Sequence, residues 1–229
     1  MMGTKTKLWY LKRINLFNEL TEEELKQIDR MTEMLTFKRR QQIFFQGDPG
    51  GFVYCLKSGR VKISHLSPGG KELILDIMVP GEIFGEILGG SEAVQDTMAE
   101  AMEDALLCSI SRARFEQLLR AHPELSFRLT KLIGLRLKRI ESRIEDLVFK
   151  GVQGRLATIL LQLTRDHGTP DSRGLLLRTP ITQQQLAALI GASREVVNQT
   201  LGDFRRQGLI AFEGRRIIVS DQSALAKLA

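Results

Sequence analysis

Hydrophobic positions recur with two different periods along the chain, and the change of period divides it into segments. Residues 21–35 place apolar side chains at helical spacing behind Thr21 and Glu24, which form a capping-box pair and predict a helix. From about residue 39 to residue 110 the apolar residues come instead in short runs between glycine-containing turns. Strands at intervals of roughly 8–12 residues with such turns predict an antiparallel β-barrel or β-roll. The clearest strand-like runs are Val53 to Leu56, Val61 to Ile63, Leu73 to Ile77 and Leu106 to Ile110.

Helical spacing returns after Ser111, first in residues 112–120 and then in a long segment from Pro123 to about residue 148. The long segment carries a narrow apolar seam flanked by charged residues, which indicates either packing on its own domain or pairing with a second copy. We favour pairing, which makes this segment a dimerisation helix. The seam begins at Leu129, and the dimer interface is predicted at Ile133, Leu137, Ile140, Ile144 and Leu147.

Two glycines in Lys150-Gly151-Val152-Gln153-Gly154 indicate a hinge, and a further apolar helix follows from Arg155 to about Thr164. We therefore predict one domain at residues 1–150 and a second at residues 151–229. The first segment holds 23 basic and 21 acidic residues, whereas the second holds 10 basic and 6 acidic residues. Most of the positive excess thus belongs to the smaller domain.

Composition narrows the class of protein. The chain has 229 residues, 43% of them hydrophobic, and a formal net charge of +6, which suffices for a packed core and permits an anionic partner. No apolar run approaches the ~20 residues that span a bilayer, so we expect a cytoplasmic protein without a membrane partner. Cys55 and Cys108 stand far apart in apolar β-runs, which predicts buried thiols rather than a disulfide framework, a zinc site or an iron–sulfur cluster.

The C-terminal segment has the pattern of a helix-turn-helix. Thr182 is placed to cap one helix, Gly191 ends it, and Ser193 is placed to cap a second helix over residues 194–206. Small residues fill the first helix where the pair must pack closely. Two helices joined by a short glycine-containing turn are typical of DNA-binding domains.

Spacing along the second helix separates a packing side from an outer side. We expect one side to pack inward and the other to face outward with residue types that pair with base edges in the major groove. A turn and strand at residues 213–219 predict a wing with two arginines placed for phosphate contact. The alternative is an ordinary helical hairpin with a solvated polar face. The predicted packing residues are Val196, Val197, Thr200, Leu201 and Phe204, the predicted base readers are Arg194, Glu195, Asn198 and Gln199, and the wing arginines are Arg215 and Arg216.

Along nearly its whole length the chain resembles the family of the cyclic AMP receptor protein and the fumarate–nitrate reduction regulator, the CRP/FNR family of bacterial transcription regulators. The resemblance implies an α+β fold with an N-terminal cyclic-nucleotide-binding-type antiparallel β-roll, a long dimerisation helix and a C-terminal winged helix-turn-helix. It also implies a homodimer that binds a pseudo-palindrome in double-stranded DNA, and RNA polymerase as a partner if the protein is an activator. The motifs that carry it are Gln46-Gly47-Asp48, Ser58-Gly59, Gly70-Lys71-Glu72, Pro80-Gly81-Glu82-Ile83-Phe84-Gly85-Glu86 and Gly191-Ala192-Ser193-Arg194-Glu195.

The family pattern implies roles for individual residues of the DNA-binding domain. Arg194 and Glu195 match positions that each read a G·C pair. Gln199 is a departure, because the cyclic AMP receptor has a second base-reading arginine there. The half-site of this protein is therefore expected to differ. Positions for phosphate contact hold Thr182, Gln184 and Ser193.

The resemblance also implies an effector pocket in the β-roll. Gly85 and Glu86 are retained, but Gln95 and Asp96 occupy the places of the arginine and serine that hold the nucleotide phosphate. A carboxylate beside a phosphate adds repulsion where attraction is required. On the long helix, the threonine and serine that contact the base are replaced by Ile140 and Glu141. We therefore expect no binding of cyclic AMP in the usual way, and the effector stays unidentified.

The histidines and carboxylates of the chain bear on two further questions, which are whether it binds another effector and whether it belongs to another class of protein. Haem requires an axial ligand, for which His65, His122 and His167 are candidates, although such histidines are usually surface residues. A metal-dependent enzyme on a β-roll requires a cluster of histidines and carboxylates, and His65 alone does not supply one, so we predict no metal, no catalytic residues and no enzyme. The remaining alternative is a cyclic-nucleotide-binding regulatory protein that acts through a protein partner.

Overall fold

The computed structural model describes residues 7–85, 87, 94–177 and 180–229, and these form two compact units. Unit 1 is Met1–Arg136 and unit 2 is Leu137–Ala229, so the division falls inside the long helix α4 (Pro123–Phe149). None of the described helices is long and apolar enough to cross a membrane.

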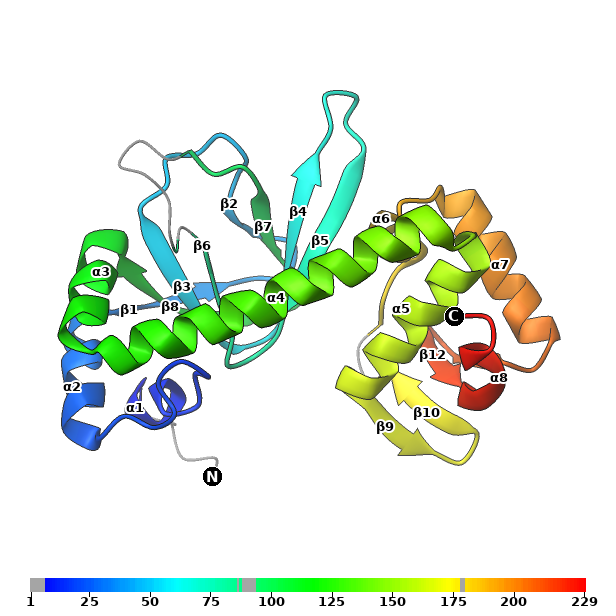
Figure 1. Cartoon of the computed structure of the whole chain (residues 1–229). Coiled ribbons are helices and arrows are strands. Elements are labelled where there is room, and N and C mark those ends of the chain that lie inside the picture. Colours follow the sequence, from blue (N-terminus) through cyan, green and yellow to red (C-terminus); the bar gives the residue numbers. More distant parts are fainter. Residues whose placement is uncertain (1–6, 86, 88–93, 178–179) are drawn as a thin grey trace. The chain divides into compact units, whose positions relative to one another are not determined.

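Unit 1 contains two four-stranded antiparallel sheets, with strand orders β1-β8-β3-β6 and β2-β7-β4-β5 (Figure 1). Glycines with positive φ lie in or beside the turns that connect the strands. The predicted β-roll is confirmed, and the four strand-like runs lie within β3, β4, β5 and β8. The strands are β1 (Glu33–Phe37), β2 (Gln42–Phe44), β3 (Phe52–Ser58), β4 (Val61–Leu66), β5 (Glu72–Met78), β6 (Ile83–Gly85), β7 (Met98–Ala101) and β8 (Ala105–Ser111).

Helices α1 (Lys7–Leu11), α2 (Glu22–Met31) and α3 (Arg112–Ala121) complete unit 1 together with the first part of α4. The capping box predicted at the start of α2 is present. The predicted end of this helix at residue 35 was wrong, because Thr32 is extended and β1 begins at residue 33. The ammonium of Lys7 donates to the carbonyls of Asp29 and Thr32, the latter at 2.6 Å, and so satisfies the helix end at this point.

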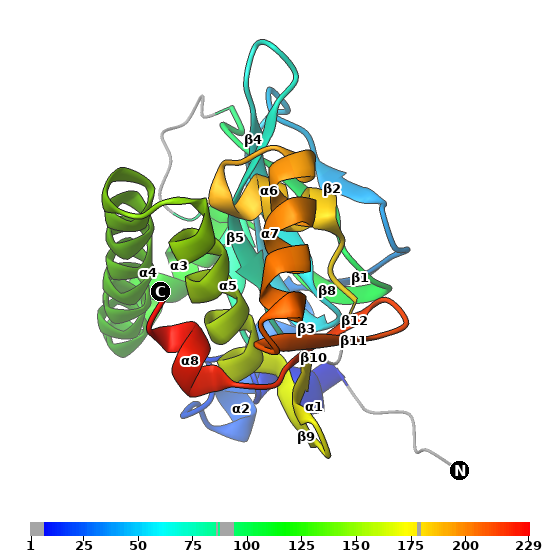
Figure 2. The same cartoon turned by 90° about the vertical axis from the view of Figure 1, so that its right-hand side faces the viewer.

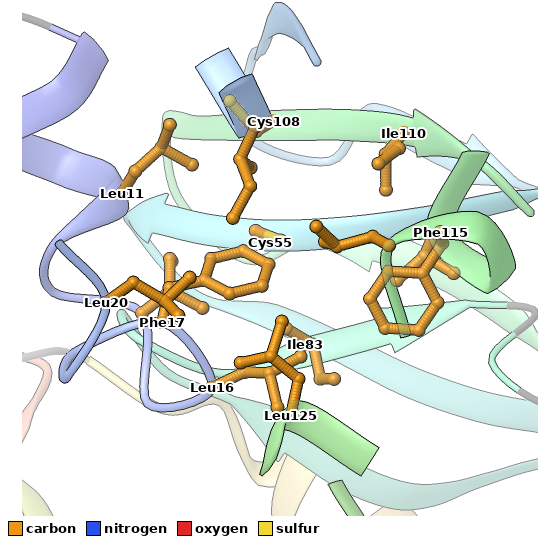
Figure 3. Packing of buried hydrophobic residues seen from close by; sticks show 14 of the residues in the cluster. Leu11, Leu16, Phe17, Leu20, Cys55, Ile83, Cys108, Ile110, Phe115 and Leu125 are labelled. Carbon is orange, nitrogen blue, oxygen red and sulfur yellow. The ribbon is translucent and has the colours of Figure 1, made fainter. Parts of the chain in front are cut away.

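One core of unit 1 lies between the sheet that contains β3 and β8 and the surrounding helices, and Figure 3 shows its close packing. Cys55 and Cys108 are directly opposed on β3 and β8, and both are fully buried. Burial, with a smaller contribution from Cys108, raises the pKa of the Cys55 thiol to about 12. The prediction of buried thiols is confirmed. A thiol with so high a pKa stays protonated at neutral pH and is a poor nucleophile.

A second core fills the space between the two sheets. The rings of Phe44, Tyr54 and Phe84 pack together, with Tyr54 stacked on Phe84 at a centroid distance of 5.4 Å. Small residues of β7, Ala99 and Ala101, lie in the same cluster and make room for the rings. This aromatic cluster adjoins Gly85, the retained glycine of the predicted effector pocket.

Unit 2 combines a helix-turn-helix with a four-stranded antiparallel sheet of order β11-β12-β10-β9 (Figure 2). Helix α5 supplies buried apolar side chains against which α6 and α7 pack. The predicted two helices and wing are confirmed, whereas the hairpin of β9 and β10 was not anticipated. The elements are α5 (Val152–His167), β9 (Gly168–Asp171), β10 (Gly174–Leu177), α6 (Gln183–Ile190), α7 (Arg194–Arg206), β11 (Ile210–Glu213), β12 (Arg216–Val219) and α8 (Gln222–Ala226).

Candidate DNA interface and effector region

The two helices of the helix-turn-helix are held by local hydrogen bonds that follow from their sequence. Thr182 and Gln185 form a capping box at the start of α6, with the Gln185 N–H donating to the Thr182 hydroxyl at 3.1 Å. At the other end Gly191 adopts the left-handed conformation, with φ 64°, and its N–H donates to the Ala187 carbonyl. The caps and the break predicted from the sequence are confirmed.

Helix α7 begins at a serine cap that also orders its first turn. The Ser193 hydroxyl accepts a hydrogen bond from the Val196 N–H at 3.3 Å. Glu195 follows in the first turn, and hydrogen bonds from its own backbone N–H and from the Ser193 side chain lower the pKa of its carboxyl. Glu195 therefore remains an acceptor at neutral pH, which is the form that pairs with the amino group of cytosine.

Burial separates the two sides of α7 as predicted, with one exception. Arg194, Glu195, Asn198 and Gln199, called here the α7 polar set, are all exposed. The exception is Val196, which we expected on the packing side but which is 40% exposed. At about 100° per residue it falls on the flank of the helix rather than on its buried face. The buried side consists of Val197, Thr200, Leu201 and Phe204.

Asn198 is linked to the preceding helix by a contact that sequence reasoning missed. The Gln183 side-chain amide donates to the Asn198 Oδ1 at 2.7 Å. Because an amide oxygen accepts two hydrogen bonds, Asn198 retains an acceptor and two donors for a base edge. No local pattern signals this bond, since it joins residues on different helices.

The two wing arginines have different surroundings. The Arg216 guanidinium donates to Glu213 at 2.6 Å, and Arg173 of the β9–β10 turn contacts the same carboxylate at 3.3 Å. Arg215 is exposed at the tip of the wing, and it forms no ion pair with any residue that the structure describes. Arg215 is thus the more accessible of the two cations for phosphate.

The apolar seam of α4 changes character along the helix. Leu129 is buried and Ile133 packs partly against the core of unit 1, so this end supports its own domain. Beyond it the apolar side chains of the seam are 42–55% exposed. The exposed seam consists of Leu137, Ile140, Ile144 and Leu147.

The glycine of the predicted effector pocket has a structural explanation. Gly85 has φ +94°, and a Cβ there would lie 2.6 Å from the Phe52 carbonyl oxygen and 2.9 Å from the Tyr54 ring. Glycine is therefore required by backbone conformation and by packing, independently of any ligand. The next predicted pocket residue, Glu86, lies outside the described residues.

None of the other predicted pocket residues that the structure describes carries a positive charge. Gln95 is buried, and its backbone pairs with Gly47 and Asp48 in the turn that follows β2. Asp96 is exposed, and so are Ile140 and Glu141 of α4. A neutral amide and a carboxylate at the phosphate positions do not match the negative charge of a cyclic nucleotide.

One cationic side chain of α4 reaches the roll, and sequence reasoning missed it. Arg136 donates to the Ile83 carbonyl at 3.2 Å, and its Nε lies 3.4 Å from the Asp76 carboxylate. Asp76 compensates the charge of this guanidinium, so Arg136 is not an uncompensated phosphate receptor. It ties α4 to β5 and β6 within unit 1.

Two known families match this chain, one within each unit. Residues 34–122 match the family described as "Cyclic nucleotide-binding domain", and residues 154–228 match "Crp-like helix-turn-helix domain".

Known proteins match over most of the chain. The "CRP-like cAMP-activated global transcriptional regulator" of Mycobacterium tuberculosis is 33% identical over 219 residues, which cover 96% of this chain and 98% of that protein. The "Global nitrogen regulator" of Nostoc sp. is 32% identical over 194 residues, which cover 84% of this chain and 87% of that protein. Among solved structures, a transcriptional regulator of the CRP family from Thermus thermophilus matches with a TM-score of 0.73 and 28% identity, covering 85% of this chain and 96% of that chain.

Proposed function

The chain belongs to the CRP family of transcription regulators, which are not enzymes, and on that premise we propose that it is a sequence-specific regulator that binds a pseudo-palindromic DNA site as a homodimer, without control by cyclic AMP. The observation that carries the proposal is the exposed α7 polar set on a capped helix whose opposite side is buried. Four adjacent side chains able to read base edges are thereby presented together.

Individual roles follow from the chemistry of the side chains. Arg194 donates to guanine and Glu195 accepts from cytosine, so that each reads a G·C pair, while Asn198 and Gln199 pair with adenine. Phosphate contacts come from the start of α6 and α7, where helix N-termini favour anions, and from the wing. The proposed phosphate contacts are Thr182, Gln184, Ser193, Arg215 and Arg216.

A second copy of the chain is the occupant that best covers the exposed seam of α4. Four aliphatic side chains spaced at 3 and 4 residues form the stripe through which parallel helices pair. A twofold dimer matches a pseudo-palindrome whose half-sites lie about one helical turn, ~34 Å, apart. Ile133, which is only partly buried against the core of unit 1, continues the proposed interface with its remaining exposed surface.

A matched pair of variants tests the dimer. Leu137 and Leu135 are both 54% exposed, but Leu135 lies outside the seam. Leu137→Asp should convert the protein to a monomer in sedimentation experiments and abolish binding to the full site, whereas Leu135→Asp should do neither. A wild-type protein that sediments as a monomer would contradict the proposal.

DNA binding is tested with a duplex selected from a random library by the full-length protein. Mobility-shift titration across a salt series should show affinity that falls steeply with salt, because several phosphate contacts release counterions. The selected sites should be pseudo-palindromic. Failure to select any sequence would contradict sequence-specific binding.

Independence from cyclic AMP is tested directly by calorimetry, and the comparison is sharp because the M. tuberculosis relative is named as cAMP-activated. We expect no binding heat and no change in DNA affinity at millimolar cyclic AMP. Micromolar or tighter binding would refute this part of the proposal. Cyclic AMP binding together with absence of DNA binding would instead favour a regulatory protein that acts through a protein partner.

A further inference from the structure

An apolar side chain stands within the proposed reading surface of α7. Val196 is 40% exposed, whereas its neighbour Val197 is fully buried. Glu195 of the α7 polar set directly precedes Val196 in the first turn, and Gln199 follows three residues later on the adjacent part of the surface. An apolar group is thus placed beside the polar readers of the same helix.

Neither packing nor helix propensity accounts for a valine at this position. An exposed side chain gains little from burial, and β-branched residues are poorer helix formers than alanine. The backbone of Val196 is fixed by other groups, because its N–H donates to Ser193 and its carbonyl accepts from the Thr200 hydroxyl at 2.9 Å. These contacts would form with any residue other than proline at position 196.

The valine side chain is well suited to contact a rigid apolar group. A helical valine occupies one strongly preferred rotamer, so little conformational entropy is lost when it is contacted. Its Cβ leans toward the N-terminus of α7, which places its methyl groups over the first turn. The apolar feature that the major groove presents there is the C5-methyl group of thymine.

We infer that Val196 is a specificity-determining residue that contacts the C5-methyl group of a thymine in each half-site. The inference rests on the proposed function, since it requires α7 in the major groove. It adds an apolar selection to the polar readout by Arg194, Glu195, Asn198 and Gln199. The recognised half-site therefore contains a thymine whose methyl group is read independently of its hydrogen-bonding edge.

Replacing thymine by deoxyuridine tests the contact, because it removes the methyl group and leaves base pairing unchanged. Each thymine of the selected site is replaced in turn, and the Kd of the full-length dimer is measured by fluorescence anisotropy at fixed salt. At one symmetric position, wild-type affinity should fall about fourfold per substituted half-site, the factor for one buried methyl group, and about fifteenfold when both half-sites are changed.

Variants assign that effect to Val196. Val196→Ala should bind the thymine site more weakly by a similar factor and should not distinguish thymine from deoxyuridine at that position. Leu228→Ala is the matched control, because Leu228 is 38% exposed in the same unit next to α8, and it should retain full sensitivity. Thermal unfolding of both variants should match the wild type, since both side chains are exposed.

The outcomes separate this inference from the proposed function. If the wild type binds its site but no thymine position shows a methyl effect that Val196→Ala removes, methyl readout is overturned while DNA binding stands. A selected half-site without thymine overturns it in the same way. If the protein binds no duplex at all, the proposed function and the inference fall together.

Discussion

The β-roll and helix α7 both carry several charged side chains, but these side chains differ in whether they have a partner within the chain. In the roll, the ammonium of buried Lys62 lies 2.6 Å from the Glu72 carboxylate and 3.4 Å from that of Glu100, to which Gln42 also donates. On α7, Arg194 is exposed and forms no ion pair with any described residue. The charge of Lys62 is therefore compensated within the roll, whereas that of Arg194 is left for a partner.

This difference predicts that charge removal in the roll affects folding and that charge removal on α7 affects binding. Breaking a buried pair is costly because the remaining charge is left without compensation. Removing an exposed cation should change the stability of the free protein little, since water solvates the cation equally well in the folded and unfolded states. The following variants test the contrast, beginning with the largest expected effect.

Lys62→Met should destabilise the protein by roughly 3 kcal/mol, because two largely buried carboxylates lose their shared cation. Urea unfolding of wild type and variant measures the change. Lys71→Met, at an exposed turn position, is the control and should change stability by less than about 0.5 kcal/mol. Equal stability of Lys62→Met and wild type would show that the roll does not depend on this cluster.

Arg194→Ala should leave stability almost unchanged and weaken binding to the selected site by about 1–3 kcal/mol per half-site. It should also relax selection at one base pair in each half-site, which a repeated selection experiment measures. Arg205→Ala, at an exposed position in the last turn of α7, should not change the selected sequence. An unchanged footprint and affinity for Arg194→Ala would refute the role assigned to this residue.

Features encoded within one turn of helix were predictable from the sequence. Thr21 with Glu24, and Thr182 with its partner three residues on, are spaced so that side chain and backbone meet whatever the rest of the fold does. The outward direction of the α7 polar set was predictable for the same reason, because helical geometry alone separates it from Val197 and Phe204.

Features that join distant segments were not predictable. The bond from Gln183 to Asn198 depends on how α6 crosses α7, and the Arg136 contact with Asp76 depends on how α4 lies against the roll. Val196 was misplaced because a flank position is buried or exposed according to what packs beside it. Periodicity describes one element at a time and carries no information about its neighbours.

Ser193→Ala should cost about 1 kcal/mol of stability through loss of the cap on α7. Fraying of the first turn should also weaken DNA binding, because Arg194 and Glu195 lie in that turn. Ser223→Ala, an exposed serine within α8, is the matched control for the loss of a hydroxyl. If Ser193→Ala weakened DNA binding without changing the unfolding free energy, the hydroxyl would act only through its proposed phosphate contact, and its role as a cap would be refuted.

The smallest effect is expected at Glu24, where it should depend on pH. Hydrogen bonds from the Thr21 side chain and backbone, with a smaller contribution from His122, lower the pKa of the Glu24 carboxyl in the folded protein. A lowered folded pKa gives stability that is present above the unfolded value and is lost as pH falls through the folded value.

Wild type should therefore be more stable than Glu24→Gln at pH 7, and the difference should shrink toward zero as the pH falls below about 4, near the ordinary pKa of glutamate. Urea unfolding at pH 7, 5 and 3.5 measures it. Glu22→Gln removes a charge from the same turn but leaves the capping box intact, so it controls for the loss of charge at the helix N-terminus. A difference between wild type and Glu24→Gln that grew as the pH fell would mean that the neutral carboxyl, and not the carboxylate, supports the cap.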